Sequence, residues 1–355
     1  MGAWGKSCEM IVHGAEPYNA EAPPSALAGS VLTPVETFYA RNHGPIPQID
    51  PDVWRLELDG LVERPMTLSL AALRTRFEHR EVVATVQCAG NRRAGLLAVR
   101  AIPGETPWGS GAISTARWTG VSLADVLAEA GPRTGAGHVE FAAPDVAAEA
   151  CPPQAYGGSI PLAKATAPEV LLAWAMNDRP LPPVHGGPVR VVVPGYVGAR
   201  SVKWVTRVTV RDRPSDNYFQ AVCYRLLAPG ATVGLRLGPL AVNSDILLPG
   251  DGSVLPAGPI PVSGYAFGGE GRGVARVDVS ADEGRSWRQA TLEPSSGPWA
   301  WRLWSTVLPL PAGEVTIVAR AWDTAAGSQP ECAASLWNPG GYANNAWPRV
   351  RLKLV

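Results

Sequence analysis

The chain has 355 residues, equal numbers of acidic and basic side chains, and a formal net charge of zero, with only 17% charged residues. This length is enough for about two domains. The balanced charge argues against a nucleic-acid-binding surface, and no apolar run approaches the roughly 20 residues of a membrane-spanning helix. We therefore expect a globular protein with no nucleic acid and no membrane among its partners.

The five cysteines are scattered, and no two of them form a CxxC pair. This pattern argues against a disulfide framework and against a zinc ribbon, so a reducing compartment is expected. The N-terminal residues show no basic segment followed by an apolar core, which predicts a cytoplasmic protein. A precursor whose export signal has been removed is the alternative.

Taken in chain order, residues 38–47 (FYARNHGPIP) begin like a strand and break into a turn that carries Arg41, Asn42 and His43. Loops that combine several hydrogen-bond donors with aromatic residues are often anion or cofactor sites, although an ordinary polar surface loop has the same composition. Residues 54–61 alternate as a strand. Residues 68–77 form a short helix that begins near Thr67 or Ser69.

Residues 82–93 (VVATVQCAGNRR) are the most informative stretch of the chain. The β-branched run predicts a buried strand that ends at Cys88, followed by a small-residue turn and the cations Arg92 and Arg93. A thiol in this setting is placed where a thiolate can be stabilised, and a thiolate is a soft ligand for a transition metal. The alternative is a core cysteine that only fills space.

The next elements alternate between turns and short regular segments. Residues 108–121 are rich in glycine, as in a loop that approaches a ligand closely. Ser122 caps a helix that runs to Ala130 and ends at Gly131. We further expect a strand over 138–141 that leads to Asp145, a turn over 156–161, and a helix over 168–176.

Residues 185–204 (HGGPVRVVVPGYVGARSVKW) are the second informative stretch, with two strand runs around a glycine-rich connection. His185, Arg190, Arg200, Ser201 and Lys203 supply donors and positive charge suited to a phosphate or pyrophosphate. The spacing matches neither a Walker loop nor a dinucleotide-binding motif. A strand pair with solvent-facing cations is the alternative.

The C-terminal third has short strands at regular spacing, which is typical of an all-β sandwich. The expected strands cover residues 260–265, 274–280, 287–292, 299–307 and 315–322. We place the domain boundary after residue 228, which gives domains over 1–228 and 229–355.

Six stretches together resemble one family: FYARNHGPIP (38–47), VQCAGNRR (86–93), GAISTARWTGV (111–121), YGGSIPL (156–162), the 185–204 segment, and NNAWPRV (344–350). The sequence resembles the sulfite oxidase family of molybdenum enzymes, most of all its haem-free plant and bacterial members. The resemblance implies an α+β fold class: a mixed α+β molybdopterin-binding domain followed by an immunoglobulin-like sandwich that forms a homodimer. It also implies a molybdenum–molybdopterin cofactor and no haem.

The resemblance also implies roles for individual residues. Cys88 corresponds to the thiolate ligand of the metal. The pocket that binds the oxyanion and carries out catalysis would contain Arg41, Cys88, Arg93, Trp108 and Tyr224. The cofactor would be held by Tyr39, Ala40, Arg41, Asn42, His43, Asp145, His185, Arg190, Arg200, Ser201, Val202 and Lys203.

The implied reaction is oxidation of sulfite to sulfate, with two electrons taken up by the metal. Reduction of nitrate or a sulfoxide on the same fold is the alternative; Tyr224 favours sulfite, because related nitrate reductases carry another residue there. The electron acceptor, oxygen or a c-type cytochrome, is left open. Gly340 stands where many members have an arginine, and a lysine is replaced near Gly104, so we expect a less positive pocket and weak sulfite binding.

Overall fold

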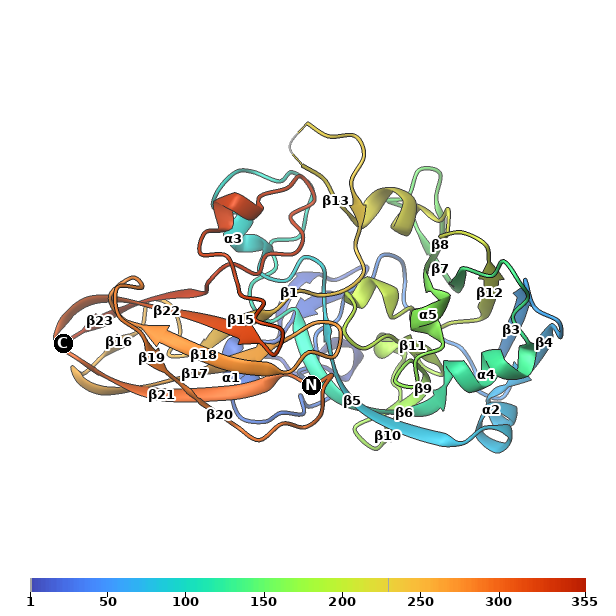
Figure 1. Cartoon of the computed structure of the whole chain (residues 1–355), viewed down its shortest axis with the longest axis horizontal. Helices are drawn as coiled ribbons and strands as arrows, with labels where there is room; N and C mark the ends of the chain where they lie inside the picture. The colour runs from blue at the N-terminus through green and yellow to red at the C-terminus, as the bar shows by residue number, and fades with distance from the viewer. Residues whose placement is uncertain (1, 229) are drawn as a thin grey trace.

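The computed structural model describes residues 2–228 and 230–355. Figure 1 shows two regions side by side, with the orange and red strands of the chain's end forming one of them. We call the part that carries β1 to β12 the N-terminal region and the part that carries β15 to β23 the C-terminal region. The expected boundary between residues 228 and 229 touches Pro229, which lies outside the described residues.

The N-terminal region is built on two five-stranded sheets. The first contains, in spatial order, β10 (Arg179–Pro180), β9 (Leu171–Met176), β6 (Ile113–Ser122) and β5 (His79–Gln87), with β11 (Arg190–Val192) also paired to β9. The second contains β4 (Met66–Ser69), β3 (Arg55–Gly60), β12 (Arg207–Arg211), β7 (His138–Ala147) and β8 (Gln154–Pro161). One apolar core takes side chains from both sheets, including Leu58, Phe141 and Leu172.

The helices of this region are short, and two of them have the expected caps. They are α1 (Pro24–Leu27), α2 (Leu70–Arg76), α3 (Arg93–Leu97), α4 (Leu123–Ala130) and α5 (Leu162–Ala165). The side chain of Ser69 accepts a hydrogen bond from the Ala72 amide, and Ser122 does the same for Ala124. Gly131 ends α4 with a φ of 70°, a conformation that costs glycine little.

The C-terminal region contains two further sheets that share one apolar core. The first contains β15 (Asn243–Leu248), β17 (Gly258–Phe267), β21 (Arg302–Leu310) and β20 (Thr291–Leu292). The second contains β16 (Val254–Leu255), β23 (Arg349–Leu354), β22 (Gly313–Asp323), β18 (Val274–Ser280) and β19 (Arg288–Gln289). The five strands expected from the alternation are therefore present, the segment over 287–292 being split in two.

The remaining elements are small. Two two-stranded hairpins and several single turns of helix connect the sheets: β1 (Ile11–Gly14) with β2 (Asn19–Glu21), β13 (Arg225–Leu226) with β14 (Leu235–Arg236), η1 (Ala3–Gly5), η2 (Pro183–His185), η3 (Gly198–Arg200), η4 (Phe219–Cys223) and η5 (Ala333–Leu336). None of the helices in the described ranges is long and apolar enough to cross a membrane.

Three expectations about local structure are wrong. Residues 171–176 form strand β9 rather than a helix, because they pair with β6 on one side and with β10 and β11 on the other. Residues 154–161 form strand β8, not a turn. Most of the segment over 108–121 is strand β6 instead of a loop. Gly111, just before this strand, lies against the backbone of Ala22 rather than against a ligand site.

The segment over 185–204 is a strand only in its first half. Arg190–Val192 forms β11, whereas residues 201–206 are irregular up to the start of β12 at Arg207. This irregular segment leaves the side chains of Ser201 and Lys203 free to enter the cavity described below.

One apolar cluster joins the regions near β5. Ile113 and Leu27 pack with Leu247, Tyr265 and Trp301 in one buried cluster. Trp301 and Trp304 are 0% and 1% exposed in the single chain, so these two tryptophans serve the fold of one chain rather than an interface between chains.

Candidate active site

A cavity opens in the N-terminal region beside the end of β5. Its lining brings together residues from segments far apart in the sequence. Those predicted as site residues are Tyr39, Ala40, Arg41, Asn42, His43, Cys88, Asp145, His185, Arg190, Ser201, Lys203 and Tyr224. The three stretches that the sequence marked as chemically informative therefore meet at one place.

The segment over residues 39–43 is held by the N-terminal hairpin. Ala40 pairs with Ala20 of β2, and the Asn42 amide donates to the side-chain oxygen of Asn19 at 2.7 Å. The side chain of Asn42 donates in turn to the Tyr18 carbonyl at 2.5 Å. These bonds hold the backbone on the side of the N-terminal hairpin, and the side chains of Tyr39, Arg41 and His43 line the cavity.

Cys88 lies at the mouth of β5, as the sequence predicted, and is 6% exposed. Its amide donates to the Ala112 carbonyl on the neighbouring chain segment at 2.9 Å. Burial raises the pKa of the Cys88 thiol, and the charges of Arg93 and Arg41 oppose this effect without reversing it. The arginines alone therefore do not make the thiolate the stable form, whereas coordination to a metal ion would deprotonate the thiol outright.

Arg93 lies beside Cys88 and is almost fully buried. Its Nη1 is 2.9 Å from a carboxylate oxygen of Glu105 and 2.9 Å from the Thr106 carbonyl. Its Nε donates to the Gly341 carbonyl at 3.1 Å, and the ring of Tyr342 lies 5.2 Å away. Gly341 and Tyr342 belong to the C-terminal region, so that region forms part of the wall around Arg93.

Tyr224 follows the single turn of π-helix η4, a type of irregularity that often marks functional sites. Its hydroxyl is 2.6 Å from Nε2 of His43, and the other ring nitrogen of His43 contacts Glu149. Burial and the charges of Arg41 and Lys203 hold the pKa of His43 well below its usual value. Burial also raises the pKa of Tyr224, so both side chains are neutral near pH 7.

The far side of the cavity is rich in positive charge. Arg190 donates to the carbonyls of His185 and Ser201, both at 3.0 Å, and Lys203 donates to the Arg41 carbonyl at 3.1 Å. Asp145 also lines the cavity, and burial raises its pKa to about 6 even though Lys203 opposes the shift. One of its carboxyl oxygens, Oδ1, is buried without a partner in the described part of the chain.

His185 has a neighbour that the sequence did not single out. Lys6, 1% exposed, points its ammonium group at Nε2 of His185 from 2.9 Å and donates to the Phe38 carbonyl at 2.5 Å. Burial lowers the pKa of Lys6 to about 7, against the opposing effect of Glu36. In its ammonium form Lys6 can only donate, so this contact then makes Nε2 the acceptor and places the proton of a neutral His185 on Nδ1.

Four predicted site residues do not line the cavity. Arg93 stands next to it. Trp108 is fully buried, and its indole Nε1 has no partner among the described residues. Arg200 is buried and donates through Nε to the Leu237 carbonyl at 2.9 Å, behind the cavity wall. Val202 is a core residue.

The sequence also missed residues that the structure brings to the site. Glu105, Glu149 and Tyr342 contact Arg93 or His43, and Tyr156 stacks on His43 with 5.2 Å between ring centroids. YGGSIPL contains Tyr156 and was therefore a usable signal. A lone glutamate in a loop gives no comparable signal.

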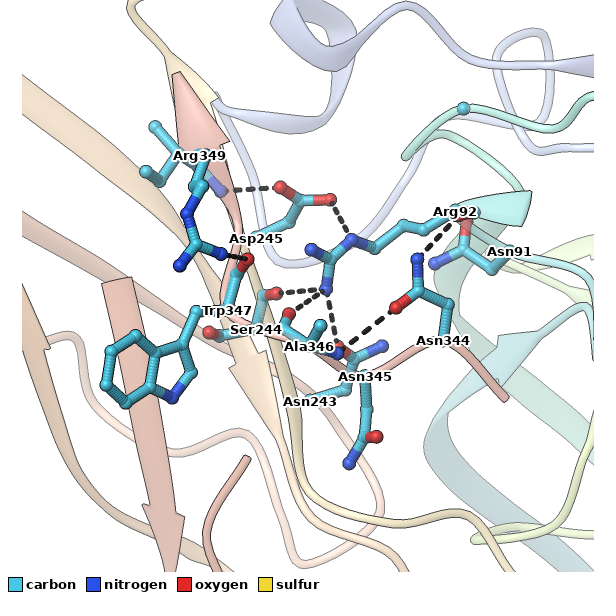
Figure 2. A network of polar contacts seen from close by, with 12 residues as sticks. Asn91, Arg92, Asn243, Ser244, Asp245, Asn344, Asn345, Ala346, Trp347 and Arg349 are labelled. Carbon is cyan, nitrogen blue, oxygen red and sulfur yellow. Dashed lines mark hydrogen bonds and ion pairs between the residues drawn. The ribbon is translucent and has the colours of Figure 1, made fainter. Parts of the chain in front are cut away.

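Arg92, the neighbour of Arg93, points to the C-terminal region instead of the cavity (Figure 2). Its Nη1 donates to the Ala346 carbonyl at 2.8 Å, and its Nε is 3.3 Å from a carboxylate oxygen of Asp245. The backbone of Arg92 has a φ of 62°, in the left-handed region, and its carbonyl accepts a bond from Asn344 at 2.8 Å. This conformation turns two consecutive arginines to opposite sides.

Two protein-domain families match consecutive parts of the chain. The oxidoreductase molybdopterin binding domain matches residues 43–219, and the Mo-co oxidoreductase dimerisation domain matches residues 237–355. Sulfite oxidase from Gallus gallus is 46% identical over 355 residues, covering 95% of this chain and 76% of that protein. The chain belongs to the sulfite oxidase family.

Other members of the sulfite oxidase family and a solved structure agree with this assignment. Sulfite oxidase from Arabidopsis thaliana is 39% identical, covering 97% of this chain and 93% of that protein. The chain spans 65% of the human mitochondrial enzyme, at 44% identity. The crystal structure of the sulfane dehydrogenase SoxCD from Paracoccus pantotrophus superposes with a TM-score of 0.83 at 27% identity, covering 97% of this chain and 86% of that one.

The sulfite oxidase family implies a molybdenum cofactor, and the residues at the cavity fit it. Cys88 provides one soft donor, which suits a metal that takes its other sulfur ligands from the pterin. Arg190 would provide a cation for a phosphate, a bound phosphate would favour the charged form of the buried Lys203, and the unpartnered Oδ1 of Asp145 could accept from an N–H group of a ring. The orphaned acceptor and the excess of cations are both what a bound anionic pterin would satisfy.

Proposed function

We propose that this protein oxidises sulfite to sulfate with the help of a molybdenum–molybdopterin cofactor. The observation that carries the proposal is the buried Cys88 thiol within the electrostatic influence of Arg41 and Arg93, in the wall of a cavity that also contains basic side chains able to hold an anionic cofactor. The 46% identity to a sulfite oxidase supports the choice of substrate.

Each part of the chain has a role in this proposal. Cys88 ligates the metal, and the cofactor is held by the predicted residues that line the cavity. Arg200 and Val202 act from behind the wall, by placing Ser201 and Lys203. When bound, the molybdenum centre supplies oxygen-atom transfer and takes up the two electrons that sulfite loses as it gains an oxygen.

The remaining groups handle the anion and the protons. Arg41 and Arg93 attract sulfite and hold its oxygens by charge-assisted hydrogen bonds. Tyr224 stays protonated because burial raises its pKa, so its hydroxyl can donate to a substrate oxygen. Conversion of sulfite and one water molecule into sulfate releases two protons along with the two electrons that the metal takes up, and the protons must leave through solvent, because burial and two cations make the neighbouring His43 a weak base.

The test is metal analysis of the purified protein together with steady-state turnover of sulfite with a dye acceptor. Molybdenum near one equivalent and turnover that is lost in Cys88→Ser support the proposal. Turnover of nitrate in place of sulfite supports the alternative, since nitrate reductase [NAD(P)H] from Hordeum vulgare is 37% identical over 99% of this chain, although the chain spans only 43% of that protein. Arg41→Ala should raise the Michaelis constant for sulfite by about one to two decades.

The C-terminal region is proposed to be an immunoglobulin-like sandwich that forms a homodimer, with the boundary after residue 228. Support comes from two sheets around one core and from the match to a dimerisation domain over 237–355. Trp299 and Trp322 are half-buried in the single chain, and because tryptophan is enriched at protein interfaces we propose them as candidates for the contact. Light scattering at micromolar concentration tests the dimer, and a monomeric mass would contradict it.

Oxygen and a c-type cytochrome are the two acceptors that we propose to test. Comparison of sulfite-dependent oxygen uptake with reduction of a c-type cytochrome separates them. We expect no haem, which a visible spectrum without a Soret band would support.

A further inference from the structure

We infer that the anion pocket beside Cys88 is built for a singly charged ligand, and that Glu105 and Tyr342 set this preference. The inference rests on the proposed sulfite chemistry and refines it: the preferred substrate is a monoanionic sulfur oxyanion such as hydrogensulfite, rather than the sulfite dianion. Neither residue has a role in the proposal above.

The first observation is that the protein itself engages most of Arg93. Nε and Nη1 of Arg93 bond to the carbonyls of Gly341 and Thr106, and Nη1 also forms an ion pair with Glu105 at 2.9 Å. Only Nη2 has no bond of this kind among the described residues. Arg93 is thus a buried, fixed cation whose charge is partly offset by a carboxylate before any substrate arrives.

The second observation is that the wall formed by the C-terminal region carries no charge. The Tyr342 ring lies 5.5 Å from the ring of Tyr224, and its hydroxyl is 3.4 Å from the sulfur of Cys223. Burial raises the pKa of Tyr342 and of Cys223, so near pH 7 both remain a neutral phenol and a neutral thiol. A side chain at Gly340 cannot supply a cation here, because its Cβ would lie 2.4 Å from the Tyr342 ring.

The charge balance follows from these contacts. Arg41 and Arg93 are cations near Cys88, and Glu105, paired with Arg93 at 2.9 Å, offsets part of their positive charge. Glu149 lies 3.8 Å from Arg41 but is about half exposed, so water screens it. Because the electrostatic interaction scales with the charge of the ligand and its desolvation cost rises more steeply still, the charge that Glu105 offsets weakens binding of a dianion more than binding of a monoanion.

The same charge argument applies to the product. Sulfate is a dianion, so the same balance that favours hydrogensulfite disfavours sulfate. The pocket therefore releases its product more readily than a pocket with an additional arginine would. Product inhibition by sulfate should be correspondingly weak.

The experiment compares two tetrahedral anions of the same shape, sulfate and perchlorate, by calorimetric titration of the holoenzyme at constant ionic strength. Glu105→Gln removes the carboxylate and leaves Arg93 in place, so it should tighten sulfate binding about tenfold more than perchlorate binding. Asp251→Asn is the matched control, since Asp251 is an exposed carboxylate paired with Arg351 at 3.0 Å. It should leave the ratio of the two dissociation constants unchanged.

A second variant keeps the test decisive if Glu105→Gln does not fold. Gly340→Arg combined with Tyr342→Val replaces the neutral wall with a cation. Like Glu105→Gln, it should tighten sulfate binding more than perchlorate binding. An equal effect on both anions, undetectable binding of both, or a shift in Asp251→Asn as large as in Glu105→Gln would overturn the inference. Because calorimetry needs no turnover, a protein that binds anions as expected but does not oxidise sulfite would contradict the proposed function alone.

Discussion

The ring of Tyr342 occupies the space into which a side chain at Gly340 would grow: a Cβ there would lie 2.4 Å from Cε2 and 2.6 Å from Cδ2. The sequence showed the missing arginine at Gly340 but gave no sign that an aromatic ring two residues later fills the gap. At Gly104, by contrast, a Cβ would meet nothing within 4 Å, so that position is open.

Gly340→Arg alone should therefore not improve sulfite binding, even though it restores the arginine that many members of the family have there. The clash with Tyr342 should lower the free energy of unfolding by about 1–3 kcal/mol. Thermal denaturation and the Michaelis constant for sulfite measure the two effects. Combining Gly340→Arg with Tyr342→Val should lower that constant about tenfold. A lower constant in the single variant, with no loss of stability, would mean that the ring moves aside freely.

Cys88→Ser should fold normally and lose nearly all sulfite turnover. Serine fits the space of the buried thiol, but a hydroxyl is a harder and less acidic ligand for a soft metal. Circular dichroism, metal content and steady-state turnover check the result. Cys151→Ser is the control, because Cys151 is an exposed free cysteine. Turnover close to that of the unmodified protein in Cys88→Ser, with the metal retained, would exclude Cys88 as a ligand.

Lys6 should make the free energy of unfolding depend on pH in the alkaline range. Its folded-state pKa of about 7 lies below the usual 10.5, so between these values the unfolded chain binds more protons than the folded one. The free energy of unfolding of the unmodified protein should then rise with pH across this window, relative to Lys6→Met, by up to about 1.4 kcal/mol per pH unit. Below pH 7 the full cost of the buried charge is present, and it is relieved as the pH rises.

Urea denaturation of the apo-protein at several pH values between 7 and 10 measures the effect of Lys6. Lys353→Met, which removes an exposed lysine, is the matched control and should give a curve parallel to that of the unmodified protein. Parallel curves for Lys6→Met and the unmodified protein would show that the Lys6 ammonium is not destabilised by burial.

The Arg92–Asp245 pair should contribute far more to stability than a surface pair does. Both side chains are nearly buried, and loss of one partner leaves an uncompensated charge, which costs about 3–5 kcal/mol. Arg92→Met should reduce the free energy of unfolding by about this amount. Arg351→Met, which breaks the exposed pair with Asp251, should cost less than about 1 kcal/mol. Equal costs in urea denaturation would contradict the structural role of Arg92.

The sequence predicted the elements whose signals are local. The β-branched run before Cys88, and the caps at Ser69, Ser122 and Gly131, act within a few residues, and all are present in the structure. Strand β9 was mistaken for a helix because leucine, alanine and methionine favour helices, while pairing with β6, β10 and β11 decides the outcome. Such pairing is set by residues far away in the chain.

The same division holds at the candidate site. Motif residues such as Cys88, His185 and Lys203 stand in recognisable stretches, and the structure gathers them around one cavity. Lys6, Glu105 and Tyr342 stand in unremarkable stretches and reach the site only through the tertiary fold. Lys6 is 179 positions from His185 and Tyr342 is 249 positions from Arg93, and no local pattern encodes contacts over that distance in the chain.

The position of Arg92 bears on whether the two regions can be used as separate parts. Arg92, in the turn between Cys88 and Arg93, contacts Asp245, Ala346 and Asn344 (Figure 2). The C-terminal region therefore holds that turn in position. A fragment that ends near residue 228 would lose these contacts of Arg92, and it would also lose Tyr342 beside Arg93. Exchange of C-terminal regions between relatives would then alter the chemistry as well as the assembly, and a hybrid enzyme would have to keep Arg92 and its partners together.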